Sequence, residues 1–187
     1  MDLFERAKTI RLRTIRDKFL VADDNEETVF QHRDDSSTSS VWNVEIITGG
    51  KYVRFKSCYG TYLTASDNLS PGIIGKKVVQ SFPKSVDMSM TDWEPVRDGF
   101  QVRLRTRKGS FLRPNGGVPP WRNTVTHDMP QTSKTHEKVL WSIDVVEALP
   151  PPHRRSRSAE NKSPSGCSDD RMSTSKTSQR YTTMEDL

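Results

Sequence analysis

The chain has 187 residues, a formal net charge of +5 and 32% hydrophobic residues, an apolar content that is low for one domain of that length. The mild positive charge argues against a dedicated nucleic-acid binder, which needs a strongly basic surface. Residues 1–6 are charged where a signal peptide needs an apolar run, and no apolar stretch approaches the length of a membrane span. We therefore expect a cytoplasmic protein, with the nucleus as a second compartment, and no membrane insertion.

The apolar deficit is concentrated at the end of the chain. Residues 149–187 consist mainly of Ser, Pro and charged residues, which cannot bury enough apolar area to offset their conformational entropy. We predict one folded domain at residues 1–148 and a disordered Ser/Pro/basic tail at residues 149–187. The two cysteines, Cys58 and Cys167, are too few for a disulfide framework, which favours a reducing compartment.

In chain order, the predicted elements begin with residues 10–13, where apolar and basic residues alternate with the period of a half-buried strand. Residues 17–18 are typical of a turn, and residues 19–22 and 28–31 read as a second and a third strand. In the fourth strand, residues 42–46, the apolar positions again share one face and begin with a tryptophan.

The same four strands recur twice. The second copy has them at residues 53–56, 62–65, 77–80 and 93–96, and the third copy at residues 102–105, 111–114, 124–127 and 141–145. In the second copy Pro95 interrupts the alternation, which indicates a bulge or an edge. The anchors Arg11, Arg54 and Arg103 lie 43 and 49 residues apart, so the copies carry insertions and span about residues 8–48, 51–98 and 100–147.

Twelve strands in three copies favour a β-trefoil, in which six strands form a short barrel and three hairpins cover one end. A propeller also has four strands per blade but usually needs at least four blades. We expect Trp42, Trp93 and Trp141 to occupy equivalent buried positions around the pseudo-threefold axis.

Several motifs resemble the plant domain-of-unknown-function family 569, which is grouped with the fascin-like, actin-cross-linking β-trefoils. The resemblance covers about residues 1–146, and the motifs that carry it stand at residues 11–13, 18–24, 27–29, 63–67, 75–78, 93–95 and 116–128. It implies the trefoil fold and kinship with actin-binding modules. It implies no assigned activity, because function resides in sites rather than in folds.

A first candidate site is the outward basic pair on the first strand of each copy. Its members are Arg11, Arg13, Arg54, Lys56, Arg103 and Arg105. Together they could meet a polyanionic surface such as an actin filament, an anionic glycan or a phosphoinositide head group. The alternative is a solvated face that Glu45, Glu94 and Asp144 neutralise from the fourth strands.

A second candidate is the loop 115–123, the one place where a tryptophan lies outside the core register. Two glycines and two prolines define its backbone path and present Trp121 beside Arg122. An aromatic residue next to a cation in a stiff loop is typical of a recognition anchor. We predict a site centred on Trp121 and Arg122, with polar contacts from Asn123, His127 and Asp128. The alternative is that Trp121 folds back and plugs the open end of the barrel.

Enzyme and cofactor motifs are missing from the sequence. The four histidines lie far apart without metal-ligand spacing, and there is no nucleophile elbow or phosphate loop. The Gln-x-Trp signature of ricin-type lectins is absent before all three core tryptophans. We therefore expect a monomeric, non-enzymatic binding module with no metal or cofactor. Its partner is a protein, with actin suggested by kinship; the alternative is a glycan or another anionic ligand on a trefoil loop.

Overall fold

The computed structural model describes residues 4–47, 49–73, 75–130 and 137–150. The chain divides after Pro152, and all described residues lie before that division. The predicted tail falls almost wholly outside the described residues. Within them the fold is all-β, with twelve strands and three short 3₁₀ helices.

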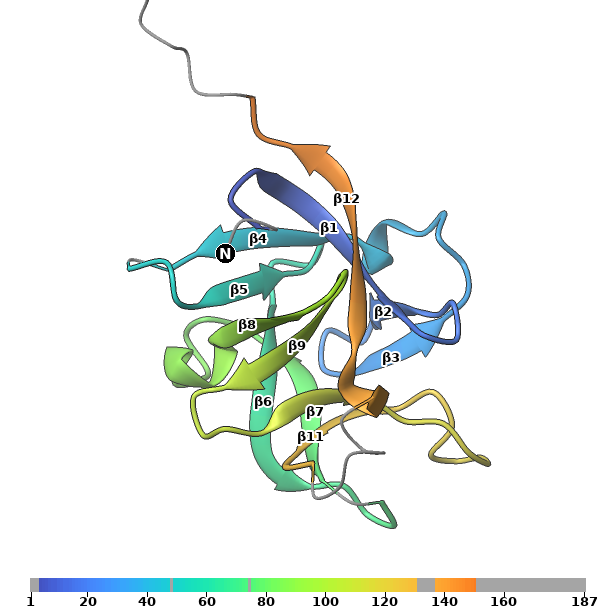
Figure 1. Cartoon of the computed structure of the whole chain (residues 1–187). Coiled ribbons are helices and arrows are strands. Elements are labelled where there is room, and N and C mark those ends of the chain that lie inside the picture. The colour runs from blue at the N-terminus through green and yellow to red at the C-terminus, as the bar shows by residue number, and fades with distance from the viewer. Residues whose placement is uncertain (1–3, 48, 74, 131–136, 151–187) are drawn as a thin grey trace, which may run out of the picture. The chain divides into compact units, whose positions relative to one another are not determined.

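Six strands form a closed barrel (Figure 1). They are β1 (Ala7–Thr14), β4 (Trp42–Ile46), β5 (Val53–Lys56), β8 (Trp93–Asp98), β9 (Gln101–Thr106) and β12 (Trp141–Ala148). Each pairs antiparallel with the next in that order, and β12 returns to pair with β1. Because the ring is closed, no barrel strand presents a free edge over its whole length.

The other six strands form three hairpins. These are β2 (Phe19–Ala22) with β3 (Val29–His32), β6 (Tyr62–Leu69) with β7 (Lys76–Ser81), and β10 (Phe111–Pro114) with β11 (Val125–Asp128). Each hairpin also pairs with the other two, through Thr28–Val79, Phe30–Thr124 and Thr126–Lys77. This arrangement of a six-stranded barrel and three joined hairpins confirms the predicted β-trefoil.

The barrel core contains three tryptophans in equivalent surroundings. Trp42, Trp93 and Trp141 are fully buried, as expected from the sequence. A 3₁₀ helix precedes each tryptophan and is separated from it by one residue. These helices are η1 (Thr38–Ser40), η2 (Met88–Thr91) and η3 (Glu137–Val139). We call each four-strand copy of the repeat a unit. Each indole N–H donates a hydrogen bond of 3.0–3.1 Å to the carbonyl of the leucine in the second strand of its own unit, Leu20, Leu63 or Leu112. The buried indole nitrogen is therefore satisfied in all three units.

The turns between the first and second strands also match. Asp17, Gly60 and Gly109 adopt positive φ angles of 52°, 83° and 91° at the same point of each turn. The first of these is not a glycine, and aspartate is one of the residues that tolerate this region best.

Pro95 causes no bulge. Strand β8 keeps a regular register with β9 from Trp93 to Asp98, with Pro95 opposite Leu104. Its pairing with β5 is limited to Trp93 and Val53. Beyond that point β8 has one partner strand, so a residue without an N–H is tolerated there. Of the two alternatives that Pro95 predicted, the structure therefore has the edge position and not the bulge.

Candidate functional site

The loop between β10 and β11 is held by its own backbone. The amide of Asn115 donates to the carbonyl of Thr124 at 2.9 Å, and the amide of Arg122 donates to Val118 at 3.1 Å. The Pro119–Pro120 peptide is cis. The two prolines and the hydrogen bonds across the base give this loop a defined path, as its composition predicts.

Trp121 is half-buried and lies on the loop between β6 and β7. Its indole N–H donates to the carbonyl of Pro71 at 2.9 Å. A Cβ at Gly72, whose φ is +76°, would lie 2.6 Å from the indole, so glycine is required there for this contact. Trp121 thus connects the third unit to the second and keeps part of its ring accessible.

Asn123 connects the same loop to the first unit. Its side-chain oxygen accepts a hydrogen bond of 2.5 Å from the ammonium group of Lys18, and its carbonyl accepts one of 2.8 Å from the amide of Gln31. Asn123 has a φ of 71°, a conformation that asparagine adopts more readily than most residues. These contacts place the exposed Arg122 beside the turn that follows β1.

Four cations gather around this contact. Burial lowers the pKa of Lys18, and the positive charges of Arg122, Arg33 and Arg16 lower it further. The guanidinium group of Arg16 lies against Gly116, where a Cβ would overlap it. Among the described residues, no carboxylate pairs with the side chains of Arg16, Arg33 or Arg122. We call Arg16, Lys18, Arg33, Trp121, Arg122 and Asn123 the basic site.

A hollow of about 490 Å³ adjoins the basic site and shares Arg16 with it. All three units line it: residues 14–16 and Gln31 from the first, residues 72–73 from the second, and residues 113–117 with Lys138 from the third. Ile15 is 70% exposed at this hollow. The hollow therefore combines apolar lining with excess positive charge.

His127, predicted as a polar contact of the loop site, is buried and has both ring nitrogens engaged. One lies 2.8 Å from the hydroxyl of Ser110 and the other 2.8 Å from the carbonyl of Ser66. Gln31 and Gln80 occupy the same place in the other hairpins and likewise bond carbonyls of a neighbouring unit. Burial lowers the pKa of His127, so the imidazole is held neutral and joins two hairpins.

Asp128 pairs with Arg113, and no hydrogen bond or ion pair among the described residues joins it to Trp121 or Arg122. Its second carboxylate oxygen is buried and has no hydrogen-bond partner among the described residues. Arg113 lines the hollow and is paired with Asp128, so the hollow's cations without a carboxylate partner among the described residues are Arg16, which belongs to the basic site, and Lys138.

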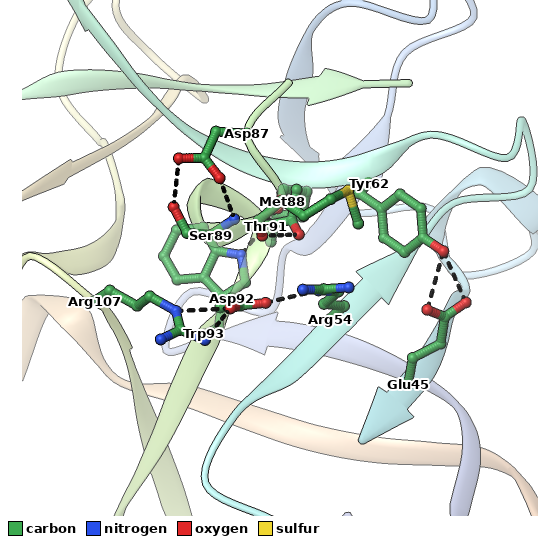
Figure 2. Close-up of polar contacts among 11 residues, drawn as sticks. Glu45, Arg54, Tyr62, Asp87, Met88, Ser89, Thr91, Asp92, Trp93 and Arg107 are labelled. Carbon is green, nitrogen blue, oxygen red and sulfur yellow. Dashed lines mark hydrogen bonds and ion pairs between the residues drawn. The ribbon is translucent and has the colours of Figure 1, made fainter. Parts of the chain in front are cut away.

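The basic pairs on the first strands do not form one shared cationic surface. Arg13 pairs with Asp144 at 2.9 Å, and Arg105 pairs with Glu94 at 2.8 Å, so fourth-strand carboxylates neutralise both. The other four have separate partners: Arg11 with Ser40, Arg54 with Asp92, Lys56 with the ring of Tyr62, and Arg103 with Asp98. Glu45 instead accepts hydrogen bonds from the Tyr62 hydroxyl (Figure 2).

Figure 2 shows one polar cluster that the sequence did not indicate, a buried Asp92 between Arg54 and Arg107. Asp92 precedes the core Trp93, at the place where the other units have Val41 and Leu140. Its carboxylate is only 1% exposed, and both arginines are within 2.6 Å of it. Both arginines bind the same buried carboxylate, and removing one partner of such a buried contact is costly, so we interpret this cluster as a structural contact.

Within the described ranges, no group of three or more His, Cys, Asp or Glu side chains could hold a metal ion. No helix in the same ranges has the length and apolar character needed to cross a bilayer.

Sequence reasoning placed Trp121, Arg122 and Asn123 together but missed Arg16, Lys18 and Arg33. One signal was present: Lys18 stands where the other units have the small hydroxyl residues Thr61 and Ser110. That substitution marks the first-unit turn as different, although its contact with Asn123 depends on the closed fold.

A family model described as a β-trefoil domain of unknown function (DUF569) matches residues 1–141. No curated protein is significantly similar to the chain in sequence.

Solved β-trefoil structures are similar in fold. The designed threefold-symmetric protein ThreeFoil has a TM-score of 0.58 at 16% identity, over 73% of this chain and 98% of its own. A ricin B-like lectin of Macrolepiota procera, solved with lactose, has a TM-score of 0.57 at 15% identity, over 74% and 95%. A GlcNAcα1-4Gal-releasing endo-β-galactosidase from Clostridium perfringens has a TM-score of 0.56 at 18% identity, over 74% of this chain but only 32% of the enzyme. At these identities the similarity is one of fold alone.

Proposed function

The chain belongs to the DUF569 family of β-trefoil domains, and we propose that it is a non-enzymatic binding module that holds an anionic ligand at the basic site. The proposal includes the cytoplasmic location and the monomeric state expected from the sequence.

The observation that carries the proposal is the uncompensated charge at the basic site. Elsewhere in the domain, arginines such as Arg13, Arg54 and Arg105 have carboxylate partners at 2.6–2.9 Å. At the basic site, Arg16, Arg33 and Arg122 have none within the described residues, and burial together with their charges lowers the pKa of Lys18. Like charges held together without counter-charges raise the free energy of the unbound protein, and an anion would relieve that repulsion.

The position of the site supports the same proposal. The turn after β1 and the loop before β11 are held by hydrogen bonds of the fold, and Arg33 comes from the bend that follows β3. A rigid loop loses little entropy when a ligand binds. The lectin solved with lactose supports the idea that a trefoil can host a ligand, although the Gln-x-Trp signature of that class is absent here.

An acidic protein surface would meet the same cations. An actin filament, the partner suggested by the family resemblance, is one such surface. A filament and a small anion would present the same kind of anionic group to these cations.

The test is isothermal titration calorimetry of the full chain at two salt concentrations. The three titrants are a sulfated heparin oligosaccharide, a phosphorylated inositol and lactose. We expect at least one anion to bind, with affinity that falls as salt rises, and lactose not to bind. The double variant Arg33→Glu/Arg122→Glu should lower anion affinity at least tenfold.

A matched control is Arg97→Glu/Lys84→Glu, which makes the same change in net charge at exposed residues outside the basic site. Neither control residue has a carboxylate partner in the described part of the chain. Equal losses in the two double variants would mean that general charge, and not the basic site, attracts the ligand. Failure of every anion to bind would refute the proposed function.

A further inference from the structure

We propose that the ligand of the basic site is a small polyol that carries at least two phosphate groups, either free or as the head group of a lipid. This inference rests on the proposed function and names the class of anion.

The first argument is the amount of charge. Four cations lie near one contact, the hydrogen bond of 2.5 Å between Lys18 and Asn123. Arg122 directly precedes Asn123, Arg16 stands two residues before Lys18, and Arg33 lies across from Lys18 because Phe19 pairs with His32. A phosphate monoester carries about −1.5 to −2 charges at neutral pH. Two such groups would therefore compensate the four cations, whereas one carboxylate or one sulfate would neutralise a single cation and leave the others uncompensated.

The second argument is the type of cation. Three of the four are arginines, whose planar guanidinium groups bind phosphate oxygens through two parallel hydrogen bonds. The guanidinium groups of Arg33 and Arg122 have no carboxylate partner within the described residues. They can therefore turn toward a ligand without breaking an ion pair. Lys18 supplies a point charge that is already oriented by Asn123.

The third argument is the shape of the hollow beside the cations. Its volume of about 490 Å³ falls within the range of about 300–1,000 Å³ that is usual for small-molecule sites. Of the basic-site residues Arg16 lines the hollow, so a ligand that starts in the hollow meets the basic site at Arg16 and must extend beyond the lining to contact Lys18, Arg33 and Arg122. An extended sulfated chain or a filament would contact an open surface and would need no such hollow.

The fourth argument is the lining of the hollow. Ile15 and Ile73 provide apolar contacts for the C–H faces of a ring. Gly116 has no Cβ, which lets the Arg16 guanidinium lie against the loop. A ring with hydroxyl and phosphate substituents matches this combination of apolar and cationic groups.

Trp121 provides a local reporter. It is the one half-buried tryptophan of the chain, and it rests on Gly72, a residue of the hollow, whereas the other three tryptophans are fully buried. Binding in the hollow is expected to change the fluorescence of Trp121. The change should disappear in Trp121→Phe, which has the same basic residues.

The experiment compares four probes on the full chain: myo-inositol trisphosphate, inorganic phosphate, a sulfated heparin disaccharide and vesicles that contain 5% phosphatidylinositol bisphosphate. We expect the trisphosphate to bind at least tenfold more tightly than inorganic phosphate, because a single phosphate reaches fewer cations. We expect the same margin over the disaccharide, because each sulfate ester carries about one negative charge and each phosphate monoester about −1.5 to −2. Arg33→Glu/Arg122→Glu should weaken trisphosphate binding at least tenfold, with an unchanged far-ultraviolet spectrum. Arg97→Glu/Lys84→Glu should change it less than threefold.

The vesicle arm identifies the source of the phosphates. Vesicle binding that the soluble trisphosphate displaces would support the shared head-group chemistry, and soluble binding without vesicle binding would support a free ligand. Vesicle binding that the trisphosphate does not displace would overturn the inference.

Other outcomes separate the inference from the proposed function. Tighter binding of the sulfated disaccharide, lost in Arg33→Glu/Arg122→Glu, would overturn the phosphate class and leave the anion-binding function intact. Equal affinity for inorganic phosphate would overturn the requirement for two phosphate groups. Absence of binding to all four probes would overturn both.

Discussion

Asp92 offers the sharpest test of how polar groups stabilise this trefoil. Its carboxylate is 1% exposed and accepts from Arg54 on one oxygen and from Arg107 on the other (Figure 2). Asp92→Asn keeps the shape but leaves one oxygen for two guanidinium groups. The amide nitrogen, itself a donor, then faces an arginine that also donates.

The expected cost follows from this geometry. A hydrogen bond to a charged group contributes about 1.5–3 kcal/mol, and breaking a fully buried ion pair costs about 3–5 kcal/mol. Arg54 and Arg107 are 20% and 46% exposed, so water can solvate them once the carboxylate charge is gone. We therefore expect Asp92→Asn to lower the free energy of unfolding by about 2–3 kcal/mol, which corresponds to a fall in Tm of about 5–10 °C.

The measurement is urea denaturation of wild type, Asp92→Asn and the control Asp144→Asn. Asp144 also pairs with an arginine, Arg13, but both partners are more than one third exposed. Its loss should therefore cost less than about 1 kcal/mol. A cost for Asp92→Asn no larger than that of the control would refute the reasoning that burial gives this ion pair its importance.

Three further predictions concern the core, the hairpins and the partner. Replacing Trp42, Trp93 or Trp141 by Ala should each cost about 3–5 kcal/mol in urea denaturation, because each removes a fully buried ring and its hydrogen bond; a cost below 1 kcal/mol at any of them would contradict their equivalence. His127 faces Lys76, Asp67 and Asp128, and burial lowers its pKa in the folded state below the usual 6.5. Its contribution to stability is complete above about pH 6.5 and falls as the pH drops below that value, because the unfolded chain then binds the proton. His127→Gln, which copies Gln31 and Gln80, should reduce this pH dependence of Tm, and an unchanged profile would argue against a buried neutral imidazole. Finally, a monomeric trefoil should not bundle actin filaments, because bundling needs two sites that engage at once; bundles pelleted at low speed by a demonstrably monomeric protein would contradict this.

The sequence determined the strands, the fold and the core of this protein. Alternation such as that at residues 10–13 is a local signal, since successive side chains of a strand face opposite sides. Its threefold recurrence together with a tryptophan in each fourth strand was enough to predict the β-trefoil and the burial of Trp42, Trp93 and Trp141. Pro95 predicted either a bulge or an edge, and the structure has a regular register there with one partner strand.

The tertiary structure decided which charges are paired and which are not. The sequence shows Arg54 and Arg122 as similar cations, yet Arg54 meets the buried Asp92, and Arg122 joins Arg16 and Arg33 around Lys18. Lys18 and Asn123 are 105 positions apart and meet only because the hairpins of the first and third units pair with each other. Local periodicity predicts which face of its own strand a side chain lies on. Its electrostatic partners depend on the elements that closure of the barrel brings to that face, and those contacts have no signature in the order of residues.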